Sequence, residues 1–527
     1  MKTALKHIFT ATAVLSLLAA AESASAQDQQ QERDYGRLSG SFETNTIQYV
    51  PDRDVATPTD RFGSNNYLKL DYSIGGFTAG AQAELYAPVL QGFNPNLQKS
   101  RITNKFVGWS DGKFNVTVGD FYEQFGSGIA LRSWEDRALG FNNSLEGVRA
   151  GFSNDYVTVK GVYARPRMFM GYTDTWVRGG DVSLSVGRLL GMQNHYLALE
   201  GSYVNRFMGG YAADSSITVD PGMNIYSGRL VLDLDFGLSI KGEYVGKGDD
   251  RHMDDGQWKA MKGNAQLIEI GYSGNGLGIF FTGRRLERAG TKIDAADGSE
   301  ANTMNYLPSL TRQYTYSLAT LDPYSTDMDD EMGGQLDVFY TFKRGSKLGG
   351  KYGTRVHANV STFYPLEKRG AKMYPMYRDV SFDLEKQWNR KVKTTLLYAV
   401  QTFSPNNGVT ATTEVHNVFV ADVLYKFTTR NSLRVEAQYL YSKENTDWWA
   451  ATAEFNLAPR WSFFVSDMYN HGAEKVHYYN AGVSFTQSRT RLAVSYGRNR
   501  EGYVCSGGVC RLMPAYTGAN ISLTTSF

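Results

Sequence analysis

The sequence predicts an all-β protein whose chain closes into a single large antiparallel transmembrane β-barrel. Three observations predict this class: side chains alternate between apolar and polar along many short segments, the connections between those segments alternate between short and long, and the last segment ends at an aromatic residue. A β-sandwich also alternates along its strands, so the alternation alone does not distinguish the two architectures. The connections do, because a secreted sandwich has no reason to sort its turns by length.

Residues 1–26 are predicted to be a signal peptide. Lys2 and Lys6 precede an apolar run over residues 8–20, and an Ala-Ser-Ala sequence ends immediately before Gln27. Basic residues, an apolar stretch and a small-residue cleavage site in this order are typical of exported proteins. No cysteine follows the site directly, so a lipoprotein anchor is not indicated, and no later segment has the roughly 20 uninterrupted apolar residues of a membrane helix.

The exported chain is expected to be one domain. Residues 27–34 are predicted to be a short periplasmic tail, and no break in composition divides residues 35–527, the predicted barrel. The alternation begins just after the tail, so we do not expect the large amino-terminal plug of siderophore receptors. Basic and acidic residues nearly cancel at a formal net charge of +2, which gives no case for a nucleic-acid partner.

The expected strands carry apolar side chains on one face and polar side chains on the other. In the segment 68–74 the even-numbered residues are apolar, whereas Lys69 and Asp71 occupy the opposite face. One face suits lipid and the other suits a water-filled interior. The charged residues that this alternation predicts on the lumen wall are Lys69, Asp71, Glu84, Lys160, Glu200, Lys241, Glu243, Arg434 and Glu436. Their signs are mixed, which predicts weak charge selectivity.

Connections between the expected strands alternate in length. Short ones are predicted at residues 75–76, 110–113, 153–155, 273–276, 428–431, 458–460 and 487–490. Long ones are predicted at residues 51–64, 124–144, 166–180, 208–222, 247–261, 288–333 and 501–514. Short periplasmic turns and long extracellular loops are typical of outer-membrane barrels. We expect about 24 strands, within a range of roughly 20–24, and an even number places both termini in the periplasm.

The last predicted strand, residues 516–527, has no residue after it. Its backbone needs a pairing partner, and closure against the first strand near Leu38 supplies one. The terminal Phe527 falls on the lipid-facing side and resembles the signal by which outer-membrane barrels are recognised for insertion. That resemblance implies the barrel-assembly machinery as a partner during insertion, in addition to outer-membrane lipid.

The most distinctive stretch begins at Gly119. Strict alternation from Val116 and Val118 would point Asp120 at lipid, which is costly for a charge, so we expect a bulge or bend at Gly119 that turns Asp120 inward. Glycines at 126 and 128 permit a tightly folded loop in the lumen. The charged residues expected there as lumen or constriction residues are Asp120, Glu123, Arg132, Glu135, Asp136 and Arg137. Structural packing of an inward loop and a ligand-contacting constriction are both open interpretations.

The run Gly-Asp-Phe-Tyr-Glu-Gln-Phe-Gly-x-Gly from Gly119, followed by Leu131-Arg132 and by Leu-Glu-Gly-Val-Arg at 145–149, carries a family resemblance. It resembles a family of uncharacterised outer-membrane barrel proteins from Bacteroidota, and the similarity covers most of the mature chain. The resemblance implies a location in the outer membrane and a barrel fold. It implies no catalytic residue.

Two cysteines, Cys505 and Cys510, lie close together in Cys-Ser-Gly-Gly-Val-Cys. The oxidising environment of an exported protein favours a disulfide that pins one loop. A metal site is less favoured, because two thiols without a nearby histidine fall short of the usual four ligands.

The long loop 288–333 contains an acidic cluster and several tyrosines. Asp327, Asp329, Asp330 and Glu331 do not follow the spacing of a calcium loop, so a solvated acidic loop is favoured over a metal site. The tyrosines in this loop, which could form a docking or sugar-stacking surface or pack the loop on itself, are Tyr306, Tyr314, Tyr316 and Tyr324. We favour packing, and no cofactor is expected.

Catalysis is not expected. A phospholipase barrel would need a histidine and a serine one residue apart on a strand, and no histidine after the signal peptide has a serine at that spacing. His252 lies near Asp254 and Asp255, but a His-Asp protease would also need a second acidic site to polarise water. The leading hypothesis is a non-enzymatic outer-membrane channel or transport protein. The alternative is a structural or assembly subunit that docks envelope proteins through its extracellular loops or lumen.

Overall fold

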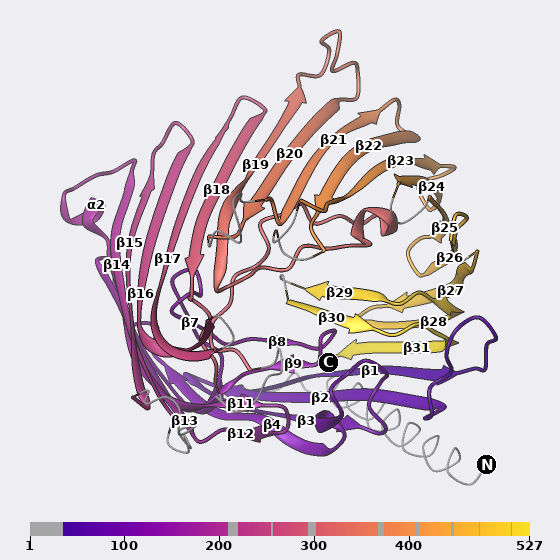
Figure 1. The fold of residues 1–527 in the computed structure, drawn as a ribbon. Coiled ribbons are helices and arrows are strands. Elements are labelled where there is room, and N and C mark those ends of the chain that lie inside the picture. The colour runs from indigo at the N-terminus through magenta and orange to yellow at the C-terminus, as the bar shows by residue number, and fades with distance from the viewer. Residues whose placement is uncertain are drawn as a thin grey trace.

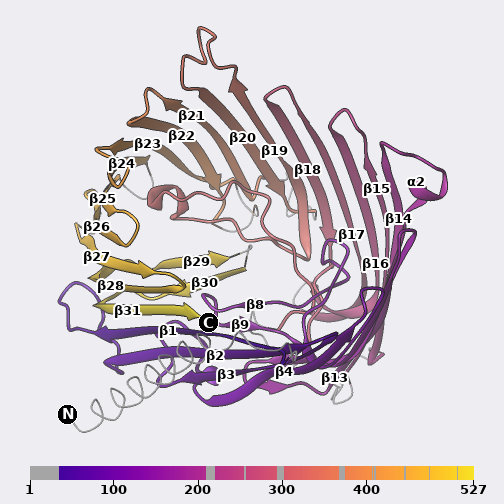
Figure 2. The same ribbon diagram turned by 180° about the vertical axis from the view of Figure 1, so that it is seen from behind.

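In the computed structural model the chain is a closed antiparallel β-barrel of 24 strands, which confirms the predicted fold class. Strand β1 (Arg37–Tyr49) pairs with β31 (Tyr516–Ser526) and closes the ring. Figures 1 and 2 show the ring from two sides, with segments of the chain crossing its interior. The structure describes residues 35–208, 220–254, 257–293, 302–366, 374–405, 408, 411–443, 447–473, 475–506 and 509–527.

The remaining barrel strands follow one another around the ring in chain order. They are β2 (Phe62–Ile74), β3 (Phe77–Tyr86), β4 (Ser100–Ser110), β5 (Phe114–Phe121), β10 (Leu145–Ser153), β11 (Val157–Met168), β13 (Thr175–Leu184), β14 (Tyr196–Met208), β15 (Gly222–Asp233), β16 (Leu238–Asp254), β17 (Gln257–Gly274), β18 (Leu277–Glu287), β19 (Asp330–Phe342), β20 (Thr354–Tyr364), β21 (Tyr377–Gln387), β22 (Val392–Phe403), β23 (Glu414–Lys426), β24 (Asn431–Ser442), β25 (Trp448–Leu457), β26 (Trp461–Asn470), β27 (His477–Gln487) and β28 (Thr490–Asn499).

Short elements lie in the connections between these strands. They are η1 (Pro95–Leu97), β6 (Gln124–Phe125), β7 (Leu131–Arg132), β8 (Glu135–Asp136), β9 (Phe141–Asn142), β12 (Gly171–Tyr172), α2 (Val186–Leu189), η2 (Ser317–Thr320), β29 (Gly502–Ser506) and β30 (Val509–Met513). Within the described ranges, no helix has the length and apolar character needed to cross a membrane.

The seam of the barrel joins the last residue to the first strand. The backbone N–H of Phe527 donates to the Gly40 carbonyl, and the N–H of Gly40 donates to the Phe527 carbonyl, each at 3.0 Å. A Cβ at Gly40 would lie only 2.5 Å from a ring carbon of Phe527. Glycine is therefore required where the terminal ring crosses the first strand, beside the predicted pairing position near Leu38.

Large apolar side chains cover the outer face of the barrel. On β5, Val116 and Val118 are 38% and 54% exposed, whereas Thr117 between them is 8% exposed. On β26, Phe463 and Val465 are exposed in the same way. An outer face with this composition suits hydrocarbon rather than water.

One end of the barrel carries mostly short turns, and the other end carries the long loops. Two connections at the short-turn end depart from the predicted pattern. Residues 185–195 include the helix α2, and residues 343–353 form a further extended turn. The sorting of connections by length therefore holds for most of the ring but not at these two positions.

Two predicted long loops are wrong, because strands occupy most of them. β16 continues to Asp254 and β17 begins at Gln257, with a register shift between Lys247 and Asp250. Across residues 166–180, β11, β12 and β13 leave only short connections. The polar residues that suggested a loop instead find partners inside the barrel, as Lys247 does with Asp250 at 3.0 Å.

Candidate functional site: an occluded lumen

Two loops from the long-loop end enter the barrel. We call residues 122–144, between β5 and β10, the first inserted loop, and residues 288–329, between β18 and β19, the second inserted loop. In Figures 1 and 2 the second inserted loop, drawn in salmon, crosses the ring from β18 and β19 towards the side of β24. The interior near this end is therefore filled by the protein's own chain.

Apolar contacts hold the first inserted loop against the wall. Phe125, Ile129 and Leu131 are fully buried. The inward-facing wall residues in the same cluster are apolar: Val162, Ala164, Val177, Val204, Ile225, Val245, Ala265 and Leu286. Burying a side chain such as Phe, Ile or Leu stabilises by roughly 1.5–3 kcal/mol. The lumen wall is thus apolar where a loop packs on it, which interrupts the simple alternation of a water-filled barrel.

The two inserted loops bind each other through their backbones. The N–H of Arg132 donates to the Met304 carbonyl at 3.0 Å, and the N–H of Tyr306 donates to the Gly128 carbonyl at 3.2 Å. The Asn305 amide donates to the Ile129 carbonyl at 2.7 Å. Gly128 has a φ of +100°, which glycine adopts without strain. The loops therefore form one body inside the lumen.

Aromatic rings reinforce the contact between the loops. Trp134 of the first loop stacks on Tyr306 of the second with ring centroids 4.8 Å apart. The Arg132 guanidinium lies over the Tyr306 ring, 4.9 Å from its centroid. Burial lowers the pKa of this guanidinium, which nevertheless remains charged at neutral pH because arginine starts from so high a value. The predicted constriction residue Arg132 thus contacts the other loop rather than a wall charge.

The second inserted loop reaches the far wall of the barrel through η2. Leu318 is fully buried in a cluster that includes Val418, Leu440 and Trp448 of the opposite strands. The N–H of Leu318 donates to Gln438 Oε1 at 2.9 Å, so polar and apolar contacts fix the same turn. The loop therefore spans the lumen from wall to wall.

Buried polar contacts anchor the return of this loop. Arg284 Nε donates to Glu331 Oε1 at 2.6 Å, and the two side chains are 1% and 0% exposed. The Tyr324 hydroxyl donates to the other oxygen of Glu331 at 2.5 Å. Burial and the neighbouring carboxylate raise the pKa of Tyr324 well above its usual value, so the hydroxyl remains a donor.

The tyrosines of the second inserted loop pack inside the barrel, but against the wall and the first inserted loop, whereas the favoured interpretation predicted that the loop packs on itself. Tyr306 and Tyr316 are 5% and 9% exposed, and Tyr324 stacks on Phe363 with centroids 4.6 Å apart. Burial beside Asp422 raises the pKa of Tyr316 to about 12, which keeps its hydroxyl protonated at neutral pH. These rings hold the loop and are not displayed to solvent.

Three of the predicted lumen residues on the first inserted loop bind polar groups of the wall. Glu123 lies 3.0 Å from Lys160 and 3.6 Å from Arg149. The Gln82 amide donates to Glu135 at 2.8 Å, and Arg137 donates to Glu43 at 2.7 Å. Asp136 instead accepts from the N–H of Leu139 at 3.0 Å and so stabilises its own turn.

Asp120 lies on the outward-facing side of β5, so the prediction that a bend turns it into the lumen is wrong. Gly119 does have a φ of +108°, but Asp120 keeps the outward position. Its carboxylate is 1% exposed and accepts from the Lys105 backbone at 2.9 Å and from the Tyr172 hydroxyl at 2.6 Å. Lys105 also binds Glu146 at 2.9 Å. Neighbouring polar groups, rather than a bend, shelter the charge from lipid.

The nine predicted wall charges lie on inward-facing positions, where each is paired with an opposite charge. The pairs are Lys69–Asp71 at 3.2 Å, Glu84–Arg167 at 2.7 Å, Lys160–Glu123 at 3.0 Å, Glu200–Arg229 at 2.7 Å, Glu243–Arg229 at 3.8 Å, Lys241–Glu269 at 3.5 Å, Arg434–Asp422 at 2.9 Å, and Arg434 with Glu436. Sequence reasoning missed the arginine partners Arg167 and Arg229. An arginine on the polar face of a strand was the available signal.

In the β29–β30 hairpin the backbone of Cys505 pairs with that of Cys510 in register. Their side chains lie outside the described part of the structure, so the disulfide stays a prediction. Mass spectrometry of the peptide spanning both residues tests it. Identical masses before and after reduction would rule the disulfide out.

The acidic cluster spans the end of the second inserted loop and the start of β19, and the prediction that it is solvated holds for the exposed Asp329 but is wrong for the buried Glu331. Asp327 Oδ1 accepts from the N–H groups of Asp329 and Asp330 at 2.9 and 3.1 Å. Glu331 is fully buried against Arg284. Across the described residues, no group of three or more His, Cys, Asp or Glu side chains is placed to hold a metal ion.

Comparisons with known proteins identify a family. A family model described as a family of unknown function, DUF6029, matches residues 4–527. The comparison with curated proteins found no match. Among solved structures, the chain is similar to the translocation pore of the P pilus usher PapC, with 10% identity, a TM-score of 0.43, and 93% of this chain and 99% of that chain covered.

Two further solved structures are similar to the chain. The siderophore receptor PirA from Pseudomonas aeruginosa is 11% identical, with a TM-score of 0.44 and coverage of 94% of this chain and 81% of that chain. A mutant porin from Rh. blastica is 15% identical, with a TM-score of 0.28 and coverage of 63% of this chain and 100% of that chain. The likeness is to the barrel fold alone, and no function is taken from it.

Proposed function

The chain belongs to the DUF6029 family, which has no assigned function, and we propose from the geometry that it is a non-enzymatic outer-membrane channel or transport protein. In this proposal the two inserted loops narrow the passage. The observation that carries it is that these loops bind each other and span the lumen from wall to wall. A barrel of this many strands would otherwise enclose a broad interior, so the two inserted loops set the width of the passage.

Placement in the outer membrane is supported by the apolar outer face and by the sorting of the connections. Aromatic and branched side chains face outward around the ring, as hydrocarbon requires. If the short turns face the periplasm, both termini lie there, with the seam at Phe527 on the periplasmic rim. The long loops that enter the lumen then come from the extracellular side.

Weak charge selectivity is the expected behaviour of such a passage. The charges on the wall are paired with opposite charges, as in Lys69–Asp71 and Lys241–Glu269. A paired charge presents a small net field to a passing ion, whereas a strongly selective filter uses a ring of one sign. We therefore expect similar permeability for small cations and small anions.

Single-channel recording in planar lipid bilayers tests the proposal. The first variant replaces residues 125–141, the part of the first inserted loop that packs in the lumen, with a short glycine-serine linker. We expect wild-type protein to show small conductance steps and this variant to show steps several times larger. The matched control shortens residues 53–60 in the largely exposed loop between β1 and β2 and should leave the conductance unchanged.

Absence of conductance in both the wild type and the loop variant would contradict a channel. The remaining interpretation would be a structural or assembly subunit of an envelope complex. That alternative predicts that affinity purification from native membranes recovers partner proteins in fixed proportion. Recovery of the barrel alone would remove its main support.

A further inference from the structure

The turns at the short-turn end carry positive charge on one side of the ring. The turns that join the strands from β19 to β28 at this end are residues 343–353, 388–391, 427–430, 458–460 and 488–489. They contain no acidic residue, and their lysines and arginines are Lys343, Arg344, Lys347, Lys351, Arg390, Lys391, Arg430, Arg460 and Arg489. We call this set the basic rim. Figure 1 shows the strands that carry it as one continuous sector of the ring, coloured from salmon to yellow.

The turns at the same end between β2 and β18 have a different charge. Their lysine and arginine residues are Lys113 and Arg188, and their carboxylates are Asp111, Asp155 and Asp235. Arg188 also lies 3.6 Å from Asp155, so part of this charge is paired. An excess of positive charge is therefore a property of the β19–β28 sector and not of short turns in general.

The side chains of the basic rim have no carboxylate to neutralise them. All of them are exposed, and none forms an ion pair with a carboxylate in the described part of the chain. Glu385, near the end of β21, instead binds Lys393 at 2.7 Å. The terminal carboxylate of Phe527 lies near the last turn, where the N–H of Ser526 donates to the Arg489 carbonyl at 3.2 Å. One terminal carboxylate leaves a large positive excess on the rim.

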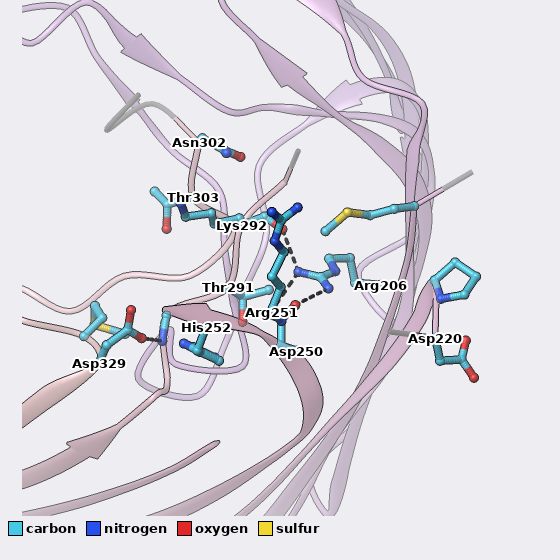
Figure 3. Close-up of a pocket in the computed structure, with 14 residues that line it drawn as sticks. Arg206, Asp220, Asp250, Arg251, His252, Thr291, Lys292, Asn302, Thr303 and Asp329 are labelled. Atoms are coloured by element: carbon cyan, nitrogen blue, oxygen red, sulfur yellow. Dashed lines mark hydrogen bonds and ion pairs between the residues drawn. The ribbon is translucent and has the colours of Figure 1, made fainter. Parts of the chain in front are cut away.

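Cations at the long-loop end are matched by carboxylates instead. Figure 3 shows a pocket between the wall and the second inserted loop, where Arg206 donates to Asp250 at 2.8 Å. The charged residues that line this pocket are Arg206, Arg251 and Lys292 against Asp220, Asp250 and Asp329. The protein thus balances its charges where it packs against itself. The unbalanced charge of the basic rim points to a partner outside the chain.

Exposed aromatic rings on the lipid-facing side accompany the basic rim. Trp388 and Phe427 lie in its turns and are 59% and 46% exposed. Trp388 Nε1 donates to the Thr394 hydroxyl on the outward side of β22 at 2.9 Å. Phe427 packs on Tyr425 and Phe455 of the outer face, with ring centroids 4.8 and 6.4 Å apart. Aromatic rings favour the boundary between membrane and water, which places the basic rim at the depth of the lipid headgroups.

We propose that the basic rim binds the headgroups of anionic phospholipids in the adjacent leaflet, which is the periplasmic leaflet in the proposed orientation. Lysine and arginine side chains donate to phosphate oxygens while their apolar stems lie along the neighbouring rings. A cluster of such side chains at a membrane surface selects lipids of net negative charge. An acidic segment of another protein would match the charge, but it would not explain the rings on the lipid-facing side.

The inference goes beyond the proposed channel. It requires that the barrel lies in a bilayer, and it does not require that the barrel conducts. The consequence is that one side of the barrel gathers anionic phospholipid, whereas the side from β2 to β18 does not.

Lipid extraction with the full-length barrel tests the proposal. The barrel is reconstituted in vesicles that contain phosphatidylglycerol as the minor lipid and phosphatidylcholine as the major lipid. It is then excised with a polymer that retains the surrounding lipid, and both lipids are quantified. We expect phosphatidylglycerol to be enriched severalfold around the wild type relative to the vesicle. High salt should remove much of this enrichment, because it screens exposed charges.

A rim variant and a matched control separate local charge from net charge. The rim variant combines Lys343→Gln, Arg344→Gln, Lys347→Gln and Lys351→Gln, and it should lower the enrichment at least twofold. The control also removes three lysines and one arginine from exposed positions, but at the long-loop end. It combines Arg61→Gln, Lys99→Gln, Lys262→Gln and Lys475→Gln and should leave the enrichment unchanged.

The folded fraction of each variant guards against a merely structural effect, and gel mobility before and after heating measures it. The replaced side chains of the rim are exposed and unpaired, so we expect the rim variant to fold as the wild type does. A second variant, Arg390→Gln with Lys391→Gln, alters a different turn and should cause a smaller loss of enrichment. It decides the matter if the first variant folds poorly.

Equal proportions of phosphatidylglycerol around the wild type and in the vesicle would overturn the proposal and favour an acidic protein segment as the partner. Equal losses in the rim variant and the control would overturn it too, since net charge alone would then attract the lipid. Enrichment that persists in both rim variants has the same meaning. A barrel that gathers phosphatidylglycerol but conducts nothing contradicts the channel alone, and one that conducts without gathering it contradicts the basic rim alone.

Discussion

The two ends of the lumen wall are built from the same strands, but ion pairs are buried at one end and exposed to water at the other. Towards the long loops, Arg167, Arg206 and Arg284 are paired with carboxylates, and their side chains are 2%, 2% and 1% exposed. Towards the short turns, the side chains of three pairs are 26–44% exposed, namely Lys69–Asp71, Lys241–Glu269 and Lys393–Glu385. The inserted loops cover the first region and leave the second accessible to water.

The choice of cation follows this difference in part. The three covered pairs named above use arginine, whose planar guanidinium binds a carboxylate through several hydrogen bonds and is weakly hydrated. Lys247, 3.0 Å from Asp250, is a covered lysine beside one of these arginines. The accessible pairs use lysine, whose ammonium group keeps much of its hydration. Covered pairs therefore contribute to the stability of the long-loop end of the lumen, because loss of one partner leaves a buried unpaired charge. Accessible pairs contribute little to stability, because water replaces a lost partner.

The largest expected effect comes from breaking a covered pair. Arg284→Met should lower the free energy of unfolding by about 3–5 kcal/mol, because Glu331 would be left buried without its cation. Unfolding by urea in lipid vesicles measures the change. The double variant Arg284→Met, Glu331→Leu should recover most of the loss. A single-variant cost below about 1 kcal/mol would show that the covered and accessible ends do not differ.

Asp120 lies on the outer face of the barrel, an environment different from both the covered and the accessible ends of the lumen. Asp120→Ala should cost about 1.5–3 kcal/mol of stability, because the Tyr172 hydroxyl and the Lys105 N–H lose a charged acceptor. It should leave the single-channel conductance unchanged, since the side chain does not face the lumen. Asp71→Ala, on the accessible inner wall, is the matched control with little effect on stability. A conductance change in Asp120→Ala would contradict its outward placement.

A variant at the seam between β1 and β31 compares the stability cost of disturbing ring closure with the cost of breaking a covered pair in the lumen. Gly40→Ala places a methyl group against the Phe527 ring and should cost about 1–3 kcal/mol by overpacking. Gly228→Ala is the control, because a Cβ there has no atom within 4 Å. The fraction of folded barrel after insertion into vesicles measures both. Adding Phe527→Ala to Gly40→Ala should restore part of the loss.

A separate change at the seam tests the insertion signal. Phe527→Asp should lower membrane insertion more than it alters any transport by the barrels that do insert. Quantification of the variant in outer-membrane fractions measures this. Normal assembly of the variant would contradict the role predicted for the terminal aromatic residue.

The smallest expected effect is at the accessible end. Lys241→Met should change the free energy of unfolding by less than about 1 kcal/mol, because Glu269 remains solvated when its partner is lost. The same urea experiment measures it. A cost as large as that of Arg284→Met would show that the short-turn end is covered in solution.

Alternation along the strands and sorting of the connections predicted the barrel, its strand number and its seam, because both depend on local sequence alone. Most of the wall charges were found in the same way. The first inserted loop was predicted from its glycines and charges, but its apolar anchors Phe125, Ile129 and Leu131 were not. Their partners come from strands far along the chain, and no local pattern reveals them.

Asp120 and Glu331 were misplaced for a related physical reason. The free energy of a charge at a given position depends on which groups surround it, and Lys105 and Tyr172 reach Asp120 only after the sheet has formed. Polar stretches such as residues 247–261 suggested loops for the same reason, since their partners, such as Arg206 of β14 for Asp250, come from other segments of the chain.

The sequence by itself determined that this chain alternates, closes and presents an apolar face to its surroundings, because strands with a period of two that must all find pairing partners leave few other ways to satisfy the backbone. Only the tertiary structure decided that the lumen is filled near the long loops and accessible near the short turns. That outcome depends on contacts between Gly128 and Tyr306 and between Leu318 and Gln438, which join segments widely separated in the chain.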